Sequence, residues 1–297
     1  MKYIPDTKTL ELEINEAVER IVQIGIEVPK RASMLMAYGI NASNINGEID
    51  FHLSGFVQPL ETPQKLTQQE RYDLKDDFRN WVVGNGFREL LEGTETFLNS
   101  LVELIAPADF LFQGKRPDKA TKTIKKFEGM GVWQKLKFLE DQYGFKTEMA
   151  HYYESLTQAR NCLTHRKGIV GDKDIKKKGH LELEWLGVDA KITEHDGTEH
   201  ILTLETKGPI DSSTFSGNEN ATLTCTYVKR TLIFQKGELI DVHPRSLQEI
   251  CSMSIYTCAK LHQLIMNWLM KHGVKINGGK LLDDPVAQIL LEAECPD

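Results

Sequence analysis

At 297 residues, with 40% hydrophobic and 27% charged side chains, the chain has the ordinary composition of a soluble globular protein that can bury a substantial core. A formal net charge of −7 does not favour nucleic-acid binding through overall charge. Five cysteines, an odd number with no Cys-x-x-Cys pair, argue against a disulfide framework and against a zinc site, and they indicate a reducing cytoplasm.

The N-terminal part of the chain is predicted to form two helical stretches separated by a strand. Residues 1–20 are charged throughout and no apolar run is long enough to span a bilayer, so we expect neither a signal peptide nor a membrane partner. Apolar residues at helical spacing predict a helix over 9–26, which Pro29 ends or kinks. Alternating apolar residues predict a strand over 49–57. The helical pattern returns over 66–105, and two glycines in its middle favour a kink between two helices: Gly84 and Gly86.

Short helices are predicted in the middle of the chain. A loop over 106–117 is followed by helical patterns over 119–127 and 132–143. Gly144 directly after the second pattern is typical of a left-handed helix cap.

The next segment is predicted to be a helix over 146–166. Its apolar residues repeat at intervals of three and four, which indicates one buried face: Met149, Tyr152, Leu156, Ala159 and Leu163. We expect the helix to end near Arg166, because cationic side chains favour a helix C-terminus and Gly168 can adopt the left-handed conformation of a cap.

After a basic linker, the apolar period changes from that of a helix to that of a strand. Alternation predicts strands that begin at Leu181 and near Ile201, and residues 222–234 are rich in strand-forming types. Residues 235–238 are a candidate hairpin turn. After Pro244, a long, largely buried helix is predicted to about residue 272.

These elements predict an α+β protein that is mainly α. The expected architecture is a helical bundle with an antiparallel β-sheet inserted between its last two long helices. We divide the chain into an N-terminal helix and strand segment (1–64), a helical bundle (65–178), an inserted β-rich region (179–243), and a C-terminal helix that completes the bundle and carries a tail (244–297).

The functional prediction depends on the end of the helix over 146–166, which reads Arg160-Asn161-x-x-x-His165. Asn161 and His165 are four residues apart and share a helix face, so the amide can hydrogen-bond to the imidazole and orient it. Unless the last turn of the helix unwinds, Arg160 and His165 diverge by about 140° around the helix axis, because they are five positions apart. A second copy of the helix in a twofold dimer would bring the two side chains together.

This motif, at a helix end and followed by a glycine and a polar turn, resembles that of the HEPN superfamily of small helical-bundle proteins. The resemblance covers about residues 66–174, with the helix near 246–272 as a continuation. It implies an HEPN-like bundle, a homodimer, and a composite ribonuclease site that needs neither a metal nor a cofactor. It also implies a cytoplasmic prokaryotic protein of phage defence or of a toxin-like stress response.

The resemblance assigns catalytic roles to Arg160, Asn161 and His165. The imidazole would take the proton from a ribose 2′-hydroxyl, the guanidinium would neutralise charge on the phosphate, and the amide would hold the imidazole or contact phosphate. Lys167 stands where one HEPN subgroup, the toxins neutralised by nucleotide transfer, carries a tyrosine, so we do not expect that form of regulation. Three cations are predicted to bind the RNA backbone: Arg166, Lys167 and Lys173.

Other interpretations of the same residues stay open. Arg160 and His165 can be structural cations that complement the dipole of their helix. The triplet Glu205-Thr206-Lys207 is of a kind found in metal-dependent nucleases, although such triplets arise often by chance. Basic stretches at 115–126 and 160–178 are compatible with a phosphate backbone or with solvated faces. The alternative function is a non-catalytic HEPN-like interaction module that docks a partner protein through its β-rich region.

Overall fold

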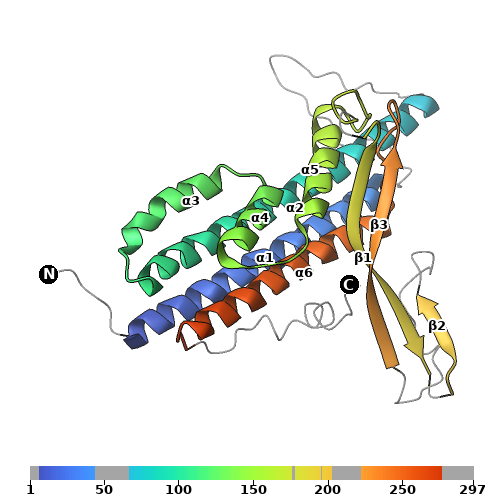
Figure 1. The fold of residues 1–297 in the computed structure, drawn as a ribbon. Helices are drawn as coiled ribbons and strands as arrows, with labels where there is room; N and C mark the ends of the chain where they lie inside the picture. Colours follow the sequence, from blue (N-terminus) through green and yellow to red (C-terminus); the bar gives the residue numbers. More distant parts are fainter. Residues whose placement is uncertain (1–6, 44–66, 176–177, 195, 203–221, 276–297) are drawn as a thin grey trace, which may run out of the picture.

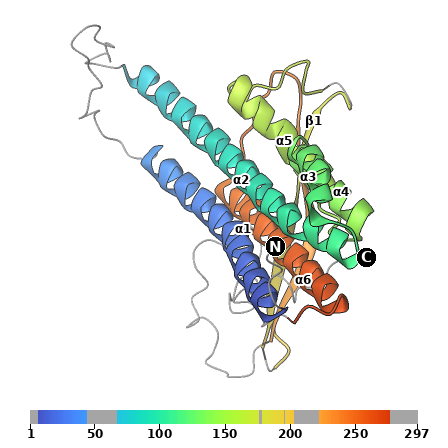
Figure 2. The same cartoon turned by 90° about the vertical axis from the view of Figure 1, so that its left-hand side faces the viewer.

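The computed structural model describes residues 7–43, 67–175, 178–194, 196–202 and 222–275. Three long helices form the body of the molecule and contact one another along their lengths (Figures 1 and 2): α1 (Thr7–Ser43), α2 (Gln68–Phe112) and α6 (Pro244–Lys271). Shorter helices pack against one side of α2: η1 (Pro117–Ala120), α3 (Thr121–Glu128), α4 (Val132–Tyr143) and α5 (Ala150–His165). The predicted class, α+β and mainly α, is confirmed, and so is a sheet inserted between the helix that carries the motif, α5, and α6.

The two N-terminal long helices are continuous where the sequence favoured breaks. Pro29 lies inside α1, and α2 runs for 45 residues through both of its central glycines and through Pro107. The predictions that the helix ends at Pro29, that the glycines separate two helices and that a loop begins at residue 106 were therefore wrong. The glycines instead allow close packing: a Cβ on Gly86 would lie 2.2 Å from Met36, and one on Gly93 would lie 1.9 Å from Val28. The close packing of α1 against α2 therefore outweighs the low helix propensity of the glycines.

The shorter helices follow their predicted positions. Helix α4 is followed by Gly144, which has φ +73° and donates its N–H to the Glu140 carbonyl, so the predicted left-handed cap is confirmed. The helix that carries the motif, α5, begins at Ala150, four residues after the predicted start, and Glu148 just before it has a positive φ of 62°.

The sheet has three antiparallel strands in the order β2-β1-β3: β1 (Leu181–Thr193), β2 (Glu199–Leu202) and β3 (Thr222–Phe234). The first half of β1 is buried against α5 and α6 through Leu181, Leu183 and Trp185. Beyond this half, β1 and β3 continue together with β2 as an arm that projects away from the helices (Figure 1). The strands predicted at 181 and 222–234 are confirmed, and part of the one near Ile201 lies outside the described residues.

The turn predicted at 235–238 forms, with Gly237 at φ +88°. The chain does not fold back on β3 after this turn. Residues 238–240 instead pair with residues 168–170, directly after α5.

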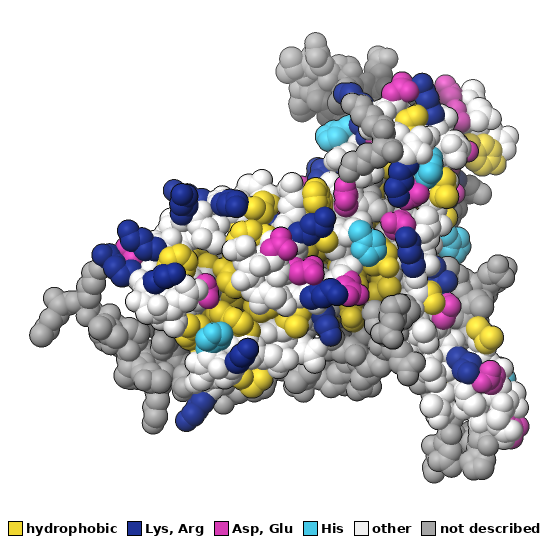
Figure 3. Space-filling model, in the orientation of Figure 1, with side chains coloured by type: hydrophobic (Ala, Val, Ile, Leu, Met, Phe, Trp, Pro, Cys, Tyr) yellow, Lys and Arg dark blue, Asp and Glu magenta, His cyan; other side chains and the backbone are white. Residues whose placement is uncertain are grey.

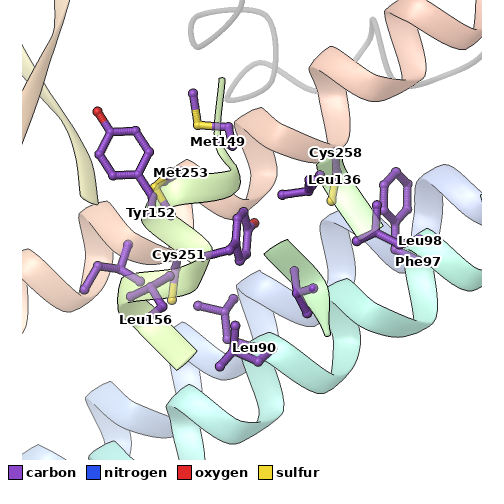
Figure 4. Packing of buried hydrophobic residues seen from close by; sticks show 14 of the residues in the cluster. Leu90, Phe97, Leu98, Leu136, Met149, Tyr152, Leu156, Cys251, Met253 and Cys258 are labelled. Atoms are coloured by element: carbon purple, nitrogen blue, oxygen red, sulfur yellow. The ribbon is translucent and has the colours of Figure 1, made fainter. Parts of the chain in front are cut away.

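One hydrophobic core joins all the long helices with the near half of the sheet. Figure 4 shows the part of it where α2, α4, α5 and α6 meet. Val18, Ala32 and Met36 of α1 belong to this core, so the described part of segment 1–64 is an integral helix of the bundle. A chain of buried hydroxyl groups crosses the core, in which Tyr153 donates to Ser254 over 3.0 Å and Ser254 lies 3.0 Å from Thr94. The strand predicted at 49–57 and the tail after 275 lie outside the described residues. None of the described helices is long and apolar enough to cross a membrane.

Candidate functional site

Helix α5 is regular up to His165, and the chain turns sharply directly after it. Lys167 and Gly168 have positive φ angles of 53° and 79°, and the N–H groups of Arg166 and Gly168 both donate to the carbonyl of Cys162. The helix therefore does not unwind between Arg160 and His165, and the two side chains leave it in different directions within one chain.

The segment after the helix is held in place by the connection between β3 and α6. Val170 donates its N–H to Glu238 over 2.9 Å, and Ile240 donates to Gly168 over 2.8 Å. An ion pair of 2.7 Å between Lys236 and Asp172 joins the same two segments. The motif thus ends on a fixed support, which is the condition for holding a catalytic side chain in one orientation.

Arg160 is half-buried, and its Nε atom is buried without a hydrogen-bond partner in the part of the chain that the structure describes. By helical spacing it shares a face of α5 with Leu163 and Thr164, which lie against α2. The described residues supply no acceptor for this N–H group, and an unpaired buried donor of this kind is costly.

His165 is exposed, and no hydrogen bond or ion pair to its ring occurs among the described residues. Asn161 is half-buried on the same face of α5, but the predicted hydrogen bond from its amide to the imidazole is not formed. The imidazole is therefore accessible, and its orientation is not fixed by Asn161 within this chain.

The three cations predicted to contact RNA have different surroundings. Arg166 pairs with Asp174 through both ends of its guanidinium fork, including a bond of 2.8 Å from Nε, and the Asp174 carboxylate is 3% exposed and also accepts from Gly171. Arg166 is thus committed to an internal contact that compensates a buried carboxylate. Lys167 and Lys173 are exposed, and neither has a hydrogen-bonding or ionic partner within the described residues.

The two basic stretches of the sequence lie at opposite ends of α2. Figure 3 shows Lys and Arg side chains gathered over α3, at the C-terminal end of α2, and they come from 115–126. The motif lies against residues 81–88, about 40 Å away at the rise of an α-helix. Within the second stretch, Arg166 and Lys178 have internal carboxylate partners.

A hollow of about 450 Å³ lies between α2 and the end of α5. Its lining includes Leu163, Thr164 and Lys167 from the motif end of α5 and the loop that follows. The remaining lining residues come from α2, and sequence analysis did not select them: Asp77, Asn80, Trp81, Gly84, Asn85 and Arg88. Trp81 is 65% exposed. Its spacing from Phe78 and Leu74 has the pattern of a buried helix face, which hides an exposed aromatic from sequence analysis.

Other side chains that could serve a site, among them further histidines and the cysteine inside the motif, have structural explanations where the structure describes them. His200 lies 2.8 Å from Glu194, and the ring of His243 accepts the N–H of Arg245 at the start of α6. Burial raises the pKa of the Cys162 thiol to about 11, which suits a packing role. Among the described residues there is no group of three or more side chains placed to hold a metal ion. His195 and the Glu205–Lys207 triplet lie outside those residues.

Comparison with known proteins gives no indication of function. No family model, curated protein sequence or solved structure matches the chain.

Proposed function

We propose that the protein is a metal-independent endoribonuclease of HEPN type, with a composite site made of Arg160 from one chain and His165 from its partner in a homodimer. This proposal rests on the lack of hydrogen-bond partners for two side chains at the end of α5. Arg160 has a buried nitrogen without an acceptor, and His165 is exposed and unpaired within the described chain. A purely structural pair of helix-end cations would be expected to bond the last carbonyls, and neither does so.

The reaction is an attack of a ribose 2′-oxygen on the adjacent phosphorus. His165 accepts the 2′-hydroxyl proton as the new P–O bond forms, because an imidazole can exchange protons near neutral pH. Arg160 hydrogen-bonds the non-bridging oxygens and stabilises their developing charge. The bond from phosphorus to the 5′-oxygen breaks, and that oxygen takes a proton from an imidazolium. The products are a 2′,3′-cyclic phosphate and a 5′-hydroxyl.

The requirement for two chains follows from the helix geometry. Arg160 and His165 are on α5 faces separated by about 140°, and α5 stays helical up to His165. A twofold axis beside the helix end would place Arg160 of each chain opposite His165 of the other. Because the chain is acidic overall, the RNA phosphates would be attracted by local cations such as Lys167 and Lys173.

The first test is cleavage of RNA by the purified full-length protein in EDTA, beside Arg160→Ala and His165→Ala, with the mass of each measured by light scattering. We expect a wild-type dimer that leaves 2′,3′-cyclic phosphate ends, and a loss of activity on the order of a hundredfold or more in each variant. The matched control is Thr157→Ala, because Thr157 lies on the same helix outside the hollow and its hydroxyl donates to the Tyr153 carbonyl.

A mixture of the two inactive variants separates a composite site from a site within one chain. After subunit exchange, each mixed dimer retains one Arg160 facing one His165, so about a quarter of the wild-type rate should return. No recovery in mixed dimers would contradict the composite site. A dimer that cleaves no RNA in any form would instead favour the non-catalytic interaction module, and the projecting β arm would be the surface to examine for a partner protein.

A further inference from the structure

The hollow between α2 and the end of α5 has the size and construction of a ligand site. Its volume of about 450 Å³ lies in the range of small-molecule sites. Its floor is a close helix crossing, because a Cβ on Gly84 would lie 3.4 Å from Leu163. Both helices are described throughout this region, so packed secondary structure determines the shape of the hollow.

Trp81 supplies a flat aromatic wall to the hollow. Its side chain is 65% exposed, whereas Trp185 in the core is 2% exposed. Phe78 stacks beside it with ring centroids 6.1 Å apart and an interplanar angle of 20°. A large indole held at the rim of a hollow and open to solvent is the type of surface on which an unpaired base stacks.

Cations and hydrogen-bonding groups surround this wall. Arg88 has only a loose partner, Glu92 at 3.8 Å, and Lys167 has none within the described chain. Asn85 uses its amide N–H on the Trp81 carbonyl, which leaves its oxygen as an acceptor. Asp77 adds a carboxylate, so the lining has two cations and one anion beside an aromatic face.

We propose that this hollow binds one unpaired nucleotide of single-stranded RNA, with the base stacked on Trp81 and the phosphate held by Arg88 and Lys167. The proposal extends the ribonuclease function proposed above, because it names the part of the substrate that lies beside the motif. Lys167 follows His165 by two residues, so a nucleotide bound here lies next to the helix end that carries the imidazole.

Other ligands fit the lining less well. Inorganic phosphate would use the cations but not the indole, and an apolar ligand would leave Asp77, Arg88 and Lys167 without polar partners. Bases inside an RNA duplex are paired and stacked, so they cannot reach an aromatic wall on a protein. A second copy of this chain would use Trp81 and Phe78 as an apolar contact, and the experiment separates that case.

The experiment measures RNA binding in a His165→Ala background, in EDTA, so that cleavage does not interfere. The probes are a fluorescein-labelled single strand of about ten nucleotides, a duplex of the same sequence, and adenosine monophosphate as a competitor. In this background we compare Trp81→Ala, Trp81→Phe, Arg88→Gln and Lys167→Asn. Asparagine is chosen at 167 because it tolerates the positive φ of 53°. The control is Tyr38→Ala, an aromatic on α1 that is 78% exposed and outside the hollow.

We expect Trp81→Ala to weaken binding of the single strand by about tenfold, and Trp81→Phe to retain most of the affinity, because any aromatic face supports stacking. Arg88→Gln and Lys167→Asn should each lower the slope of log affinity against log salt by about one. Tyr38→Ala should bind as the parent does. The duplex should bind more weakly than the single strand, and the monophosphate should compete only at much higher concentration.

Three results would overturn the proposal. Trp81→Ala could bind the single strand as tightly as the parent. The monophosphate could compete as well as the oligonucleotide, which would make the ligand a free nucleotide. Trp81→Ala could convert a dimer to a monomer in light scattering, which would assign the indole to a contact between copies. Binding that depends on Trp81 in a protein that never cleaves RNA would support the nucleotide site and contradict only the ribonuclease.

Discussion

A buried histidine on α6 shows how the surroundings of a single side chain determine its role. His262 on α6 is 6% exposed, and its Nε2 atom has no hydrogen-bond partner within the described chain. It lines a small apolar void with Val18, Phe97 and Ile265. Desolvation lowers the pKa of this imidazole to about 4 from a usual value of 6.5. The contrast with exposed His165 is instructive, because both are helix histidines and only their surroundings distinguish a packing residue from a candidate base.

The buried imidazole predicts how stability depends on pH. His262 in the unfolded chain takes up a proton below its usual pKa of 6.5, whereas in the folded chain it does so only near 4. The unfolded state therefore binds more protons in this window, and the free energy of unfolding falls as the pH falls. The total loss should be about 3 kcal/mol by pH 4.

Urea unfolding at a series of pH values between 6.5 and 4 measures this effect. In His262→Leu the part of the slope that comes from His262 should disappear, and stability at the acidic end should exceed that of the wild type. His165→Ala controls for the removal of an exposed imidazole. An identical slope in wild type and His262→Leu would contradict the assignment.

At the scale of elements, a partly buried ion pair connects α4 with α2, although lysine and glutamate are usually surface residues. Lys135 on α4 is fully buried, and its ammonium lies 2.6 Å from Glu95 on α2 and 5.6 Å from the centre of the Phe127 ring. A buried ammonium depends on its one carboxylate partner and on the aromatic face beside it. The Lys135–Glu95 pair therefore connects α3 and α4 to α2.

Removing the carboxylate should destabilise the fold. Glu95→Ala leaves the Lys135 ammonium buried without a counter-ion, at a cost of about 2 kcal/mol, which is discounted because the Glu95 side chain is 39% exposed. Lys135→Met in the same chain should restore most of that stability. Glu92→Ala is the matched control, since its partner Arg88 is 3.8 Å away and both side chains are exposed, and it should change stability by about 0.5 kcal/mol or less. Chemical unfolding of the four proteins decides the point, and equal effects of the two glutamate changes would contradict it.

Sequence patterns predicted some elements well and others poorly, for physical reasons. The positions of α4, β3 and α6 follow from periodicity with clear boundary signals, such as Gly144 at the end of α4 and Pro244 at the start of α6. The continuity of α1 and α2 could not be predicted, because the effect of Pro29, Gly86 and Gly93 depends on which helix lies opposite. The regular helix end at His165 followed from local signals. The hollow did not, because its α2 residues meet the α5 end only in the folded chain.

At the scale of the molecule, a rigid bundle carries an arm that contributes little to the core. The near half of the sheet is fixed by Glu249 on α6, which accepts from the Trp185 indole over 2.7 Å and lies 3.3 Å from Arg230. Past Val188 the residues of β1 are only half-buried, and β2 pairs only with this outer part. The arm is therefore a separable surface, suited to a partner or to control of access.

Shortening the arm tests that separation. Val188 and Tyr227 are directly opposite each other in the β1–β3 register, so a two-residue Asn-Gly turn can join them. We expect this variant to fold, with a free energy of unfolding within about 1 kcal/mol of the wild type, because Glu249 and the core contacts remain. RNA cleavage at the wild-type rate would make the arm a docking surface, and a changed rate would make it a gate. Failure to fold would contradict its independence from the core.

The pairing of residues 168–170 with residues 238–240 makes the sheet an insertion with a narrow base. The chain leaves the helices and returns to them at adjacent points, which in paired strands lie about 5 Å apart. A single tight turn at this place would therefore be enough to connect α5 with α6. The inner half of the sheet nevertheless belongs to the helical body, since Leu181, Leu183 and Trp185 fill the core.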